Sequence, residues 1–181
     1  ENPYQSSHAG GSGTDAFIIH FVPSGSALFY SSYLGGTDTD VGRDITVDRT
    51  YRAYLIGETN SGDFPTAGAY QSSLAGSTDA FVTKLEPAGN SLTYSTYLGG
   101  VTNDWGKGIA LLSDRTIYLS GYTYSADFPV ANAYQSSKEG LIDAYLGRLA
   151  FPGDSLIFST FLGGSSYDYG YGVAVDENQY A

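Results

Sequence analysis

Residues 91–100 read SLTYSTYLGG, and this stretch decides the fold because the chain contains it three times. The first copy is SALFYSSYLGG at residues 26–36, and the third is SLIFSTFLGG at residues 155–164. The closing Leu-Gly-Gly begins at Leu34, Leu98 and Leu162, so successive copies lie 64 residues apart. A fixed period of this length is typical of proteins built from tandem copies of one supersecondary unit.

Other motifs keep the same period. An Asp-Ala-aromatic motif opens at Asp15, Asp79 and Asp143. An acid follows each Leu-Gly-Gly, at Asp40, Asp104 and Asp168. Tyr-Gln-Ser-Ser and Asp-Phe-Pro also recur in the connecting segments. The repeated unit therefore spans the whole 64-residue block.

The composition limits the fold and the function. The 181 residues include no cysteine, so disulfides and thiolate metal sites are excluded. Eight basic residues against 19 acidic ones give a net charge of −11, which argues against nucleic acid and anionic membrane surfaces as partners. No run approaches the ~18 apolar residues of a membrane span, so we expect no membrane insertion. The chain begins with Glu1 and contains no methionine, which we interpret as a processed or excised segment.

One block of the repeat predicts four short strands. With 24 glycines and 17 tyrosines, and without apolar residues at helical spacing, the composition favours β structure. Turn signals divide one block into apolar runs at residues 108–113, 116–123, 143–150 and 155–162. Four-stranded antiparallel units in tandem are the blades of β-propellers. We therefore predict an all-β fold of tandem four-stranded antiparallel β-propeller blades.

Residue size predicts the order of strands within a blade. Strands near the propeller axis are crowded, and the runs at residues 43–48, 107–112 and 171–176 carry small residues. The Leu-Gly-Gly strand is rich in tyrosine and phenylalanine, which suits the wide outer rim. We place the Gly-Ile-Ala strand innermost and the Leu-Gly-Gly strand outermost. The opposite order, with the Asp-Ala-Phe strand innermost, stays open.

Residues 79–100, DAFVTKLEPAGNSLTYSTYLGG, resemble the bacterial SBBP β-propeller repeat. An acidic loop, the sequence GKGIA at residues 106–110, and then Asp-Phe-Pro and Tyr-Gln-Ser-Ser continue the resemblance, and copies or part-copies cover the chain. The resemblance implies a propeller fold, usually within large secreted or cell-surface proteins. It implies no catalytic residues.

The blocks predict two complete blades and two incomplete ones. Residues 1–36 would supply the last two strands of a blade, residues 37–100 and 101–164 one blade each, and residues 165–181 the first strand of another. A ring needs about four blades, so the ring is incomplete within this chain. Either the chain is part of a longer array, or incomplete end blades combine between copies of the chain.

In the second case, the strand at residues 171–176 would dock beside residues 15–22 of a neighbouring copy, head to tail. Contacts of this kind that do not close produce filaments. The expected assembly interface comprises residues from both ends of the chain: Tyr171, Val173, Val175, Asp15, Phe17 and Ile19.

The acidic loops are candidate calcium sites. Calcium binds six to eight oxygens, and loop carboxylates and carbonyls supply them. The candidate ligands recur after each Leu-Gly-Gly: Asp38, Asp40, Asp104 and Asp168. The alternative is that each aspartate fixes a turn by accepting main-chain hydrogen bonds. No cofactor is otherwise required.

Aromatic and basic positions have packing interpretations. Tyr30 and Tyr33 lie three apart in a strand and so point to opposite faces, each expected to pack against a neighbouring blade. Trp105 is the only tryptophan, and either packs between blades or stacks against a sugar. His20, Lys84 and Arg148 occupy one equivalent position, which we expect to face solvent.

These observations favour a non-enzymatic, extracellular or cell-surface scaffold that assembles with copies of itself into a filament or matrix. A first alternative is a propeller that binds a glycan or a protein. A second is a carboxylate-based glycosidase or lyase, since paired carboxylates carry that chemistry. An active site should place special residues in one block, whereas the acids recur in every block.

Overall fold

The computed structural model describes residues 3–176, 178, 180 and 181, and within them the chain forms ten strands and no helix. The strands are β1 (Ala16–Phe21), β2 (Leu28–Leu34), β3 (Asp40–Val47), β4 (Ala53–Thr59), β5 (Asp79–Leu85), β6 (Leu92–Leu98), β7 (Asp104–Leu111), β8 (Ile117–Thr123), β9 (Asp143–Leu149) and β10 (Leu156–Leu162). In the part of the chain that is described, nothing forms a helix able to cross a membrane.

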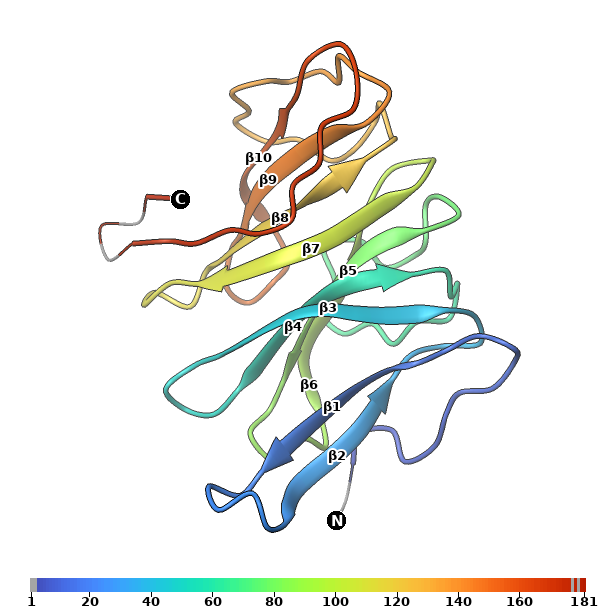
Figure 1. The fold of residues 1–181 in the computed structure, drawn as a ribbon, viewed down its shortest axis with the longest axis vertical. Coiled ribbons are helices and arrows are strands. Elements are labelled where there is room, and N and C mark those ends of the chain that lie inside the picture. The colour runs from blue at the N-terminus through green and yellow to red at the C-terminus, as the bar shows by residue number, and fades with distance from the viewer. Residues whose placement is uncertain (1–2, 177, 179) are drawn as a thin grey trace.

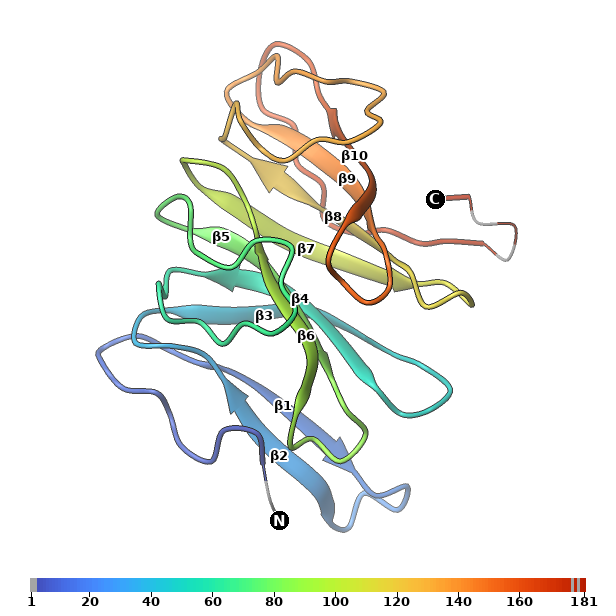
Figure 2. The same cartoon turned by 180° about the vertical axis from the view of Figure 1, so that it is seen from behind.

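The strands form three successive antiparallel sheets (Figures 1 and 2). One sheet has the order β3-β4-β5-β6 and the next β7-β8-β9-β10, while β1 and β2 pair with each other alone. Each four-stranded sheet is a meander whose neighbours in sequence are neighbours in space. The all-β prediction of tandem four-stranded units is confirmed, and the described sheets do not close a ring.

The predicted strand order is also confirmed. The Gly-Ile-Ala strands β3 and β7 occupy one edge of their sheets and contact each other, while the Leu-Gly-Gly strands β6 and β10 lie at the other edge. Small residues make this approach feasible, because a Cβ at Gly106 would lie 2.4 Å from Cγ1 of Ile56 in the preceding sheet. The opposite order is therefore wrong.

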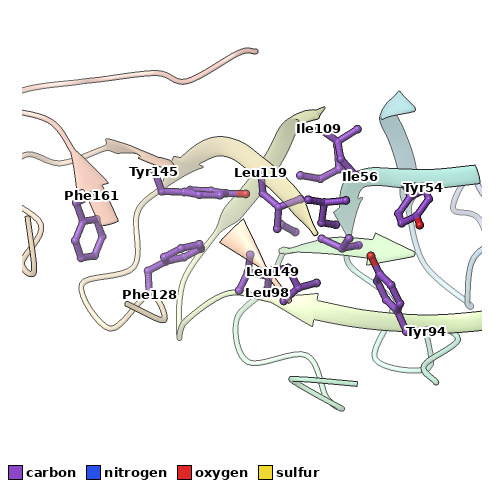
Figure 3. Close-up of a cluster of buried hydrophobic side chains, with 13 residues drawn as sticks. Tyr54, Ile56, Tyr94, Leu98, Ile109, Leu119, Phe128, Tyr145, Leu149 and Phe161 are labelled. Atoms are coloured by element: carbon purple, nitrogen blue, oxygen red, sulfur yellow. The ribbon is translucent and has the colours of Figure 1, made fainter. Parts of the chain in front are cut away.

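The core lies between the sheets. One cluster of buried side chains joins the two four-stranded sheets, and Figure 3 shows Ile56, Tyr94 and Leu98 of the first facing Leu119 and Leu149 of the second. A second cluster joins β1 and β2 to the first four-stranded sheet. Each sheet is therefore stabilised by apolar surface buried against its neighbour.

The two tyrosines of the Leu-Gly-Gly strand pack on opposite faces, as predicted. Tyr94 belongs to the cluster with the following sheet, and Tyr97 belongs to the cluster with the preceding strands. The Tyr94 ring also lies against the β9–β10 turn, where a Cβ at Gly153 would be 2.5 Å from it. Tyr30 meets Gly89 of the β5–β6 turn in the same way, at 2.4 Å. This tyrosine–glycine contact links successive sheets.

The strand expected at residues 171–176 is not formed. The segment is extended and runs beside β7 (Figure 1), with Gly172 Cα placed 2.8 Å from a Cβ built on Gly108, but it has no ladder partner among the described residues. In the complete sheets the first strand pairs with a second that begins at Ala53 or Ile117.

The edge contact expected between copies does not fit this order either. In both complete sheets the Gly-Ile-Ala strand and the Asp-Ala-aromatic strand are separated by the second strand. The strand at residues 171–176 of one copy therefore cannot take the place directly beside β1 of another without departing from the observed topology. Of the residues expected at that interface, Phe17 and Ile19 on β1 have exposed side chains that a second copy could contact in another way.

The prediction that Lys84 faces solvent is wrong. Its side chain is buried between the two four-stranded sheets, with Nζ 4.6 Å from the ring centroids of both Tyr54 and Phe151. Burial lowers the pKa of Lys84. Phe151 belongs to the β9–β10 turn of the following sheet, so the cover over Lys84 comes from the next block. The equivalent Arg148, in the last sheet, is only partly covered and pairs with Asp114 at 2.8 Å.

Candidate functional site

The acid after each Leu-Gly-Gly fixes the loop that leads into the innermost strand. The second glycine donates its N–H to this carboxylate at 2.8 Å in all three blocks, in the pairs Gly36–Asp40, Gly100–Asp104 and Gly164–Asp168. In the two complete sheets a serine hydroxyl, from Ser61 or Ser125, donates to the same oxygen at 2.9 Å. These contacts fit the turn-fixing interpretation of Asp40, Asp104 and Asp168.

The aspartate that opens the third strand fixes a second loop. The Asp79 carboxylate accepts hydrogen bonds from the main-chain N–H groups of Ala75 and Gly76 at 3.0 and 3.1 Å. It also accepts one from the Gln71 side chain, through Nε2, at 2.7 Å. The side-chain oxygen Oε1 of Gln71 in turn accepts a hydrogen bond from Gly99 N–H at 3.0 Å. The equivalent partners recur around Asp15 and Asp143. Tyr-Gln-Ser-Ser, Asp-Ala-aromatic and Leu-Gly-Gly are therefore parts of one hydrogen-bonded network.

Two buried carboxylates from successive sheets meet at Gly99. A Cβ at this position would lie 2.6 Å from Cγ of Asp79 and 2.8 Å from Oδ2 of Asp104. Both aspartates are fully buried. The glycine is therefore required by close approach of the two side chains, and the site is closed to a substrate.

The innermost edge of the second sheet carries an aromatic patch, which we define as Trp105, Tyr122, Tyr124, Tyr169 and Tyr171. The distance between ring centroids is 5.0 Å for Trp105 and Tyr122 and 5.5 Å for Trp105 and Tyr124. Tyr122 also meets Tyr169 at 4.9 Å and Tyr171 at 6.3 Å. Trp105 and Tyr122 are half-buried, whereas the other three rings are exposed. The patch is a continuous aromatic surface open to solvent.

A charged group lies beside the aromatic patch. The buried carboxylate of Glu58 accepts hydrogen bonds from Arg43 Nε at 2.8 Å and from Lys107 Nζ at 3.1 Å. Lys107 Nζ also lies 5.3 Å from the Tyr122 ring centroid. These contacts join β3, β4 and β7, so they connect the inner edges of the two sheets.

A comparison with family models finds a similarity for one part of the repeated sequence. Residues 30–65, from within β2 to the end of Asp-Phe-Pro, match the SBBP beta-propeller repeat. Over this range the chain is similar to that repeat family. No curated protein matches the sequence.

The SBBP match covers the loop that leads into β3, whereas the second loop, around Gln71 and Asp79, lies outside the matched residues. The match includes Gly36, Asp40 and Ser61, which form the loop before β3, and Asp63, which accepts from Thr37 N–H at 2.9 Å. These matched residues therefore have a structural role, which is to hold the loop between β2 and β3.

The candidate calcium ligands do not converge on one point, as the ligands of a cation site would. Asp38 is exposed and contributes its N–H, not its carboxylate, to a hydrogen bond with Ser61 Oγ at 2.9 Å. Among the described residues, no group of three or more His, Cys, Asp or Glu side chains is arranged to hold a metal ion. The proposed calcium site stays a prediction without a formed ligand set in this part of the chain.

The aromatic patch and Glu58 were only partly accessible from the sequence. Trp105 stood out as unique, but its neighbours did not. The sequence signal was a set of differences between the two complete blocks, since Tyr122 and Tyr124 replace Glu58 and Asn60 of the first sheet, and Trp105 replaces Val41. Comparing blocks position by position along the innermost edge would have found them.

Asp104 gives the loop network a pH dependence. Burial raises the pKa of Asp104 to about 6, with a further contribution from Asp79, and hydrogen bonds from Thr123, Gly100 and Ser125 oppose the shift. The folded chain therefore binds a proton here more tightly than the unfolded chain, whose reference pKa is 3.8. The associated stability is present below pH 4 and is lost as the pH rises through about 6.

We expect the Asp104→Asn variant to gain stability relative to the wild type as the pH rises from 4 to 7, by up to about 3 kcal/mol. Urea titrations at each pH measure this difference. Asp63→Asn is the matched control: hydrogen bonds from Thr37 lower the pKa of Asp63, so its stability contribution is lost only below about pH 4 and the variant should run nearly parallel to the wild type between pH 4 and 7. Parallel stability curves for the wild type and Asp104→Asn would contradict the prediction.

Proposed function

We propose that the chain is a non-enzymatic, extracellular scaffold protein whose end sheets dock face to face with those of another copy, head to tail. The observation that supports it is that the two end sheets each expose an apolar face, and that the equivalent of each face is buried inside the chain. The fold and the SBBP match support a protein of propeller repeats. Secretion, assembly and lack of catalysis are parts of the proposal.

The N-terminal face consists of side chains on the outer side of β1 and β2. Phe17 is 66% exposed, whereas its equivalent in the first complete sheet, Phe81, is 0% exposed. The same contrast holds for further residues of this face, Ile19, Phe21 and Tyr33, against Thr83, Leu85 and Tyr97. Inside the chain these positions are covered by the preceding block, so the N-terminal face has the shape and chemistry to receive one.

The C-terminal face lies on the other side of the last sheet. Leu162 is 42% exposed, whereas Leu98 at the equivalent position is 2% exposed. Phe158 is the equivalent of Tyr94, which packs on Gly153, and of Tyr30, which packs on Gly89. The free turn at Gly25, which has no atom within 4 Å of its built Cβ, is the matching partner on the N-terminal face.

A second copy is the occupant that the geometry favours. The two faces are complementary by construction, since each is one half of an interface that the chain already contains twice. They are different surfaces, so the contact is heterologous and adds copies in a row. Apolar faces of this kind are typical of protein interfaces.

The test is sedimentation velocity over a range of concentrations with two end variants. We expect the wild type to associate progressively, and Phe17→Glu or Leu162→Glu alone to remain monomeric. A mixture of the two variants should form dimers and nothing larger, because each retains one intact face. Val101→Glu is the control, since Val101 is 67% exposed and lies in the loop between β6 and β7, outside both faces.

A wild type that stays monomeric at every concentration would overturn the proposed assembly. Variants that form dimers alone, or a mixture that forms none, would exclude the head-to-tail arrangement.

A further inference from the structure

The aromatic patch sits where the blocks differ, whereas the loop network sits where they agree. The patch positions Trp105, Tyr122 and Tyr124 correspond to Val41, Glu58 and Asn60 in the preceding sheet. A purely structural role would call for the same residues in both sheets. These differences fall on β7, on the end of β8 and on the residue that follows it, next to the strand that we place nearest the axis.

The rings of the patch are arranged for stacking. Tyr169 and Tyr171 lie on the same side of one extended segment, with ring centroids 6.2 Å apart and ring planes only 27° from parallel. Their exposed fractions are 46% and 69%. Two near-parallel rings in a row present flat aromatic faces over a distance longer than one ring.

The chemistry of the patch selects the ligand class. Every ring is a tyrosine or the tryptophan, so each apolar face has a hydroxyl or N–H donor at its rim. Nearby charges do not add an ionic site, because Arg43 and Lys107 both pair with Glu58. With a net charge of −11, the chain disfavours an anionic ligand.

We propose that the aromatic patch binds a neutral β-1,4-linked oligosaccharide. The pyranose rings of such a chain present C–H groups on flat faces and hydroxyls at their edges, which complements aromatic faces with polar rims. An extended chain of these rings matches the row formed by Tyr169 and Tyr171, with Trp105 and Tyr124 providing further stacking surface. This site is separate from the end faces of the proposed assembly.

Trp105 allows a direct measurement because it is the only tryptophan. Cellohexaose and chitohexaose are titrated against the Phe17→Glu variant, at a concentration where sedimentation shows a monomer. We expect a saturable change in Trp105 emission with at least one of them. Tyr124→Ala and Tyr171→Ala should each weaken apparent affinity about fivefold or more. Both side chains are exposed, so the variants should keep the fold.

Tyr134→Ala is the matched control, because Tyr134 is 92% exposed and lies outside the patch. It should leave the affinity unchanged. No emission change with either hexaose, or an apparent affinity that is unchanged in both Tyr124→Ala and Tyr171→Ala, would overturn the proposal. A response only to the anionic hexamer of galacturonic acid would overturn the assignment to neutral sugars. Failure of the assembly test would leave this measurement unaffected, since it uses the monomer.

Discussion

Leu98→Ala is expected to lower the free energy of unfolding by about 2–4 kcal/mol. Leu98 is 2% exposed and belongs to the cluster between the two four-stranded sheets (Figure 3). Removing its side chain leaves a cavity among groups on both sheets, so the loss includes the transfer of the side chain and the unfilled space. Urea unfolding followed by circular dichroism measures the difference.

The matched control is Leu162→Ala, at the same position of the next Leu-Gly-Gly. Leu162 is 42% exposed because no complete sheet covers it, so the same truncation should cost less than about 1 kcal/mol. Equal losses in the two variants would show that burial between sheets does not determine the stability of this motif.

Gly89→Ala is expected to destabilise the chain by about 2–4 kcal/mol, from two causes. Gly89 has φ = 70°, a left-handed conformation that costs alanine about 1 kcal/mol. Its new Cβ would also lie 2.4 Å from the Tyr30 ring, which forces the two sheets apart or the ring out of its place. Overpacking of this kind costs about 1–3 kcal/mol more.

Gly25→Ala separates the two causes within the same chain. Gly25 occupies the equivalent turn, has φ = 68°, and has nothing within 4 Å of its built Cβ. We expect Gly25→Ala to lower the free energy of unfolding of the monomer by only the conformational cost, about 1 kcal/mol. If the two variants are equally destabilised in urea titrations, the tyrosine–glycine contact does not link successive sheets.

The sequence predicted the fold through positions that repeat. Asp79 and Asp104 recur at a fixed period, and their equivalents accept main-chain hydrogen bonds in the same way in the other blocks, so one interpretation served for all. The strand order followed from glycine and alanine in β7, whose small side chains fit the close approach at the inner edge.

What the sequence could not predict depends on neighbours in space. Lys84 appeared polar and solvent-facing, but Phe151 of the next block covers it. Residues 171–176 have strand-like composition, yet they pair with no strand among the described residues. The contact between Tyr122 and Tyr169 joins one block to the segment that follows the next strand pair. Such effects require the placement of one block on another.

The two-stranded sheet of β1 and β2 is covered on one side only, and its strands pair with no third strand among the described residues. In a linear stack, the free energy that holds a unit is the sum of its own and its neighbours' contributions. Local opening should therefore begin at this terminus and move inward, with the sheet β3–β6, flanked on both sides, the last to exchange its amide hydrogens. A copy docked on the N-terminal face would remove this weak end, so chain growth and protection from unfolding would be the same event.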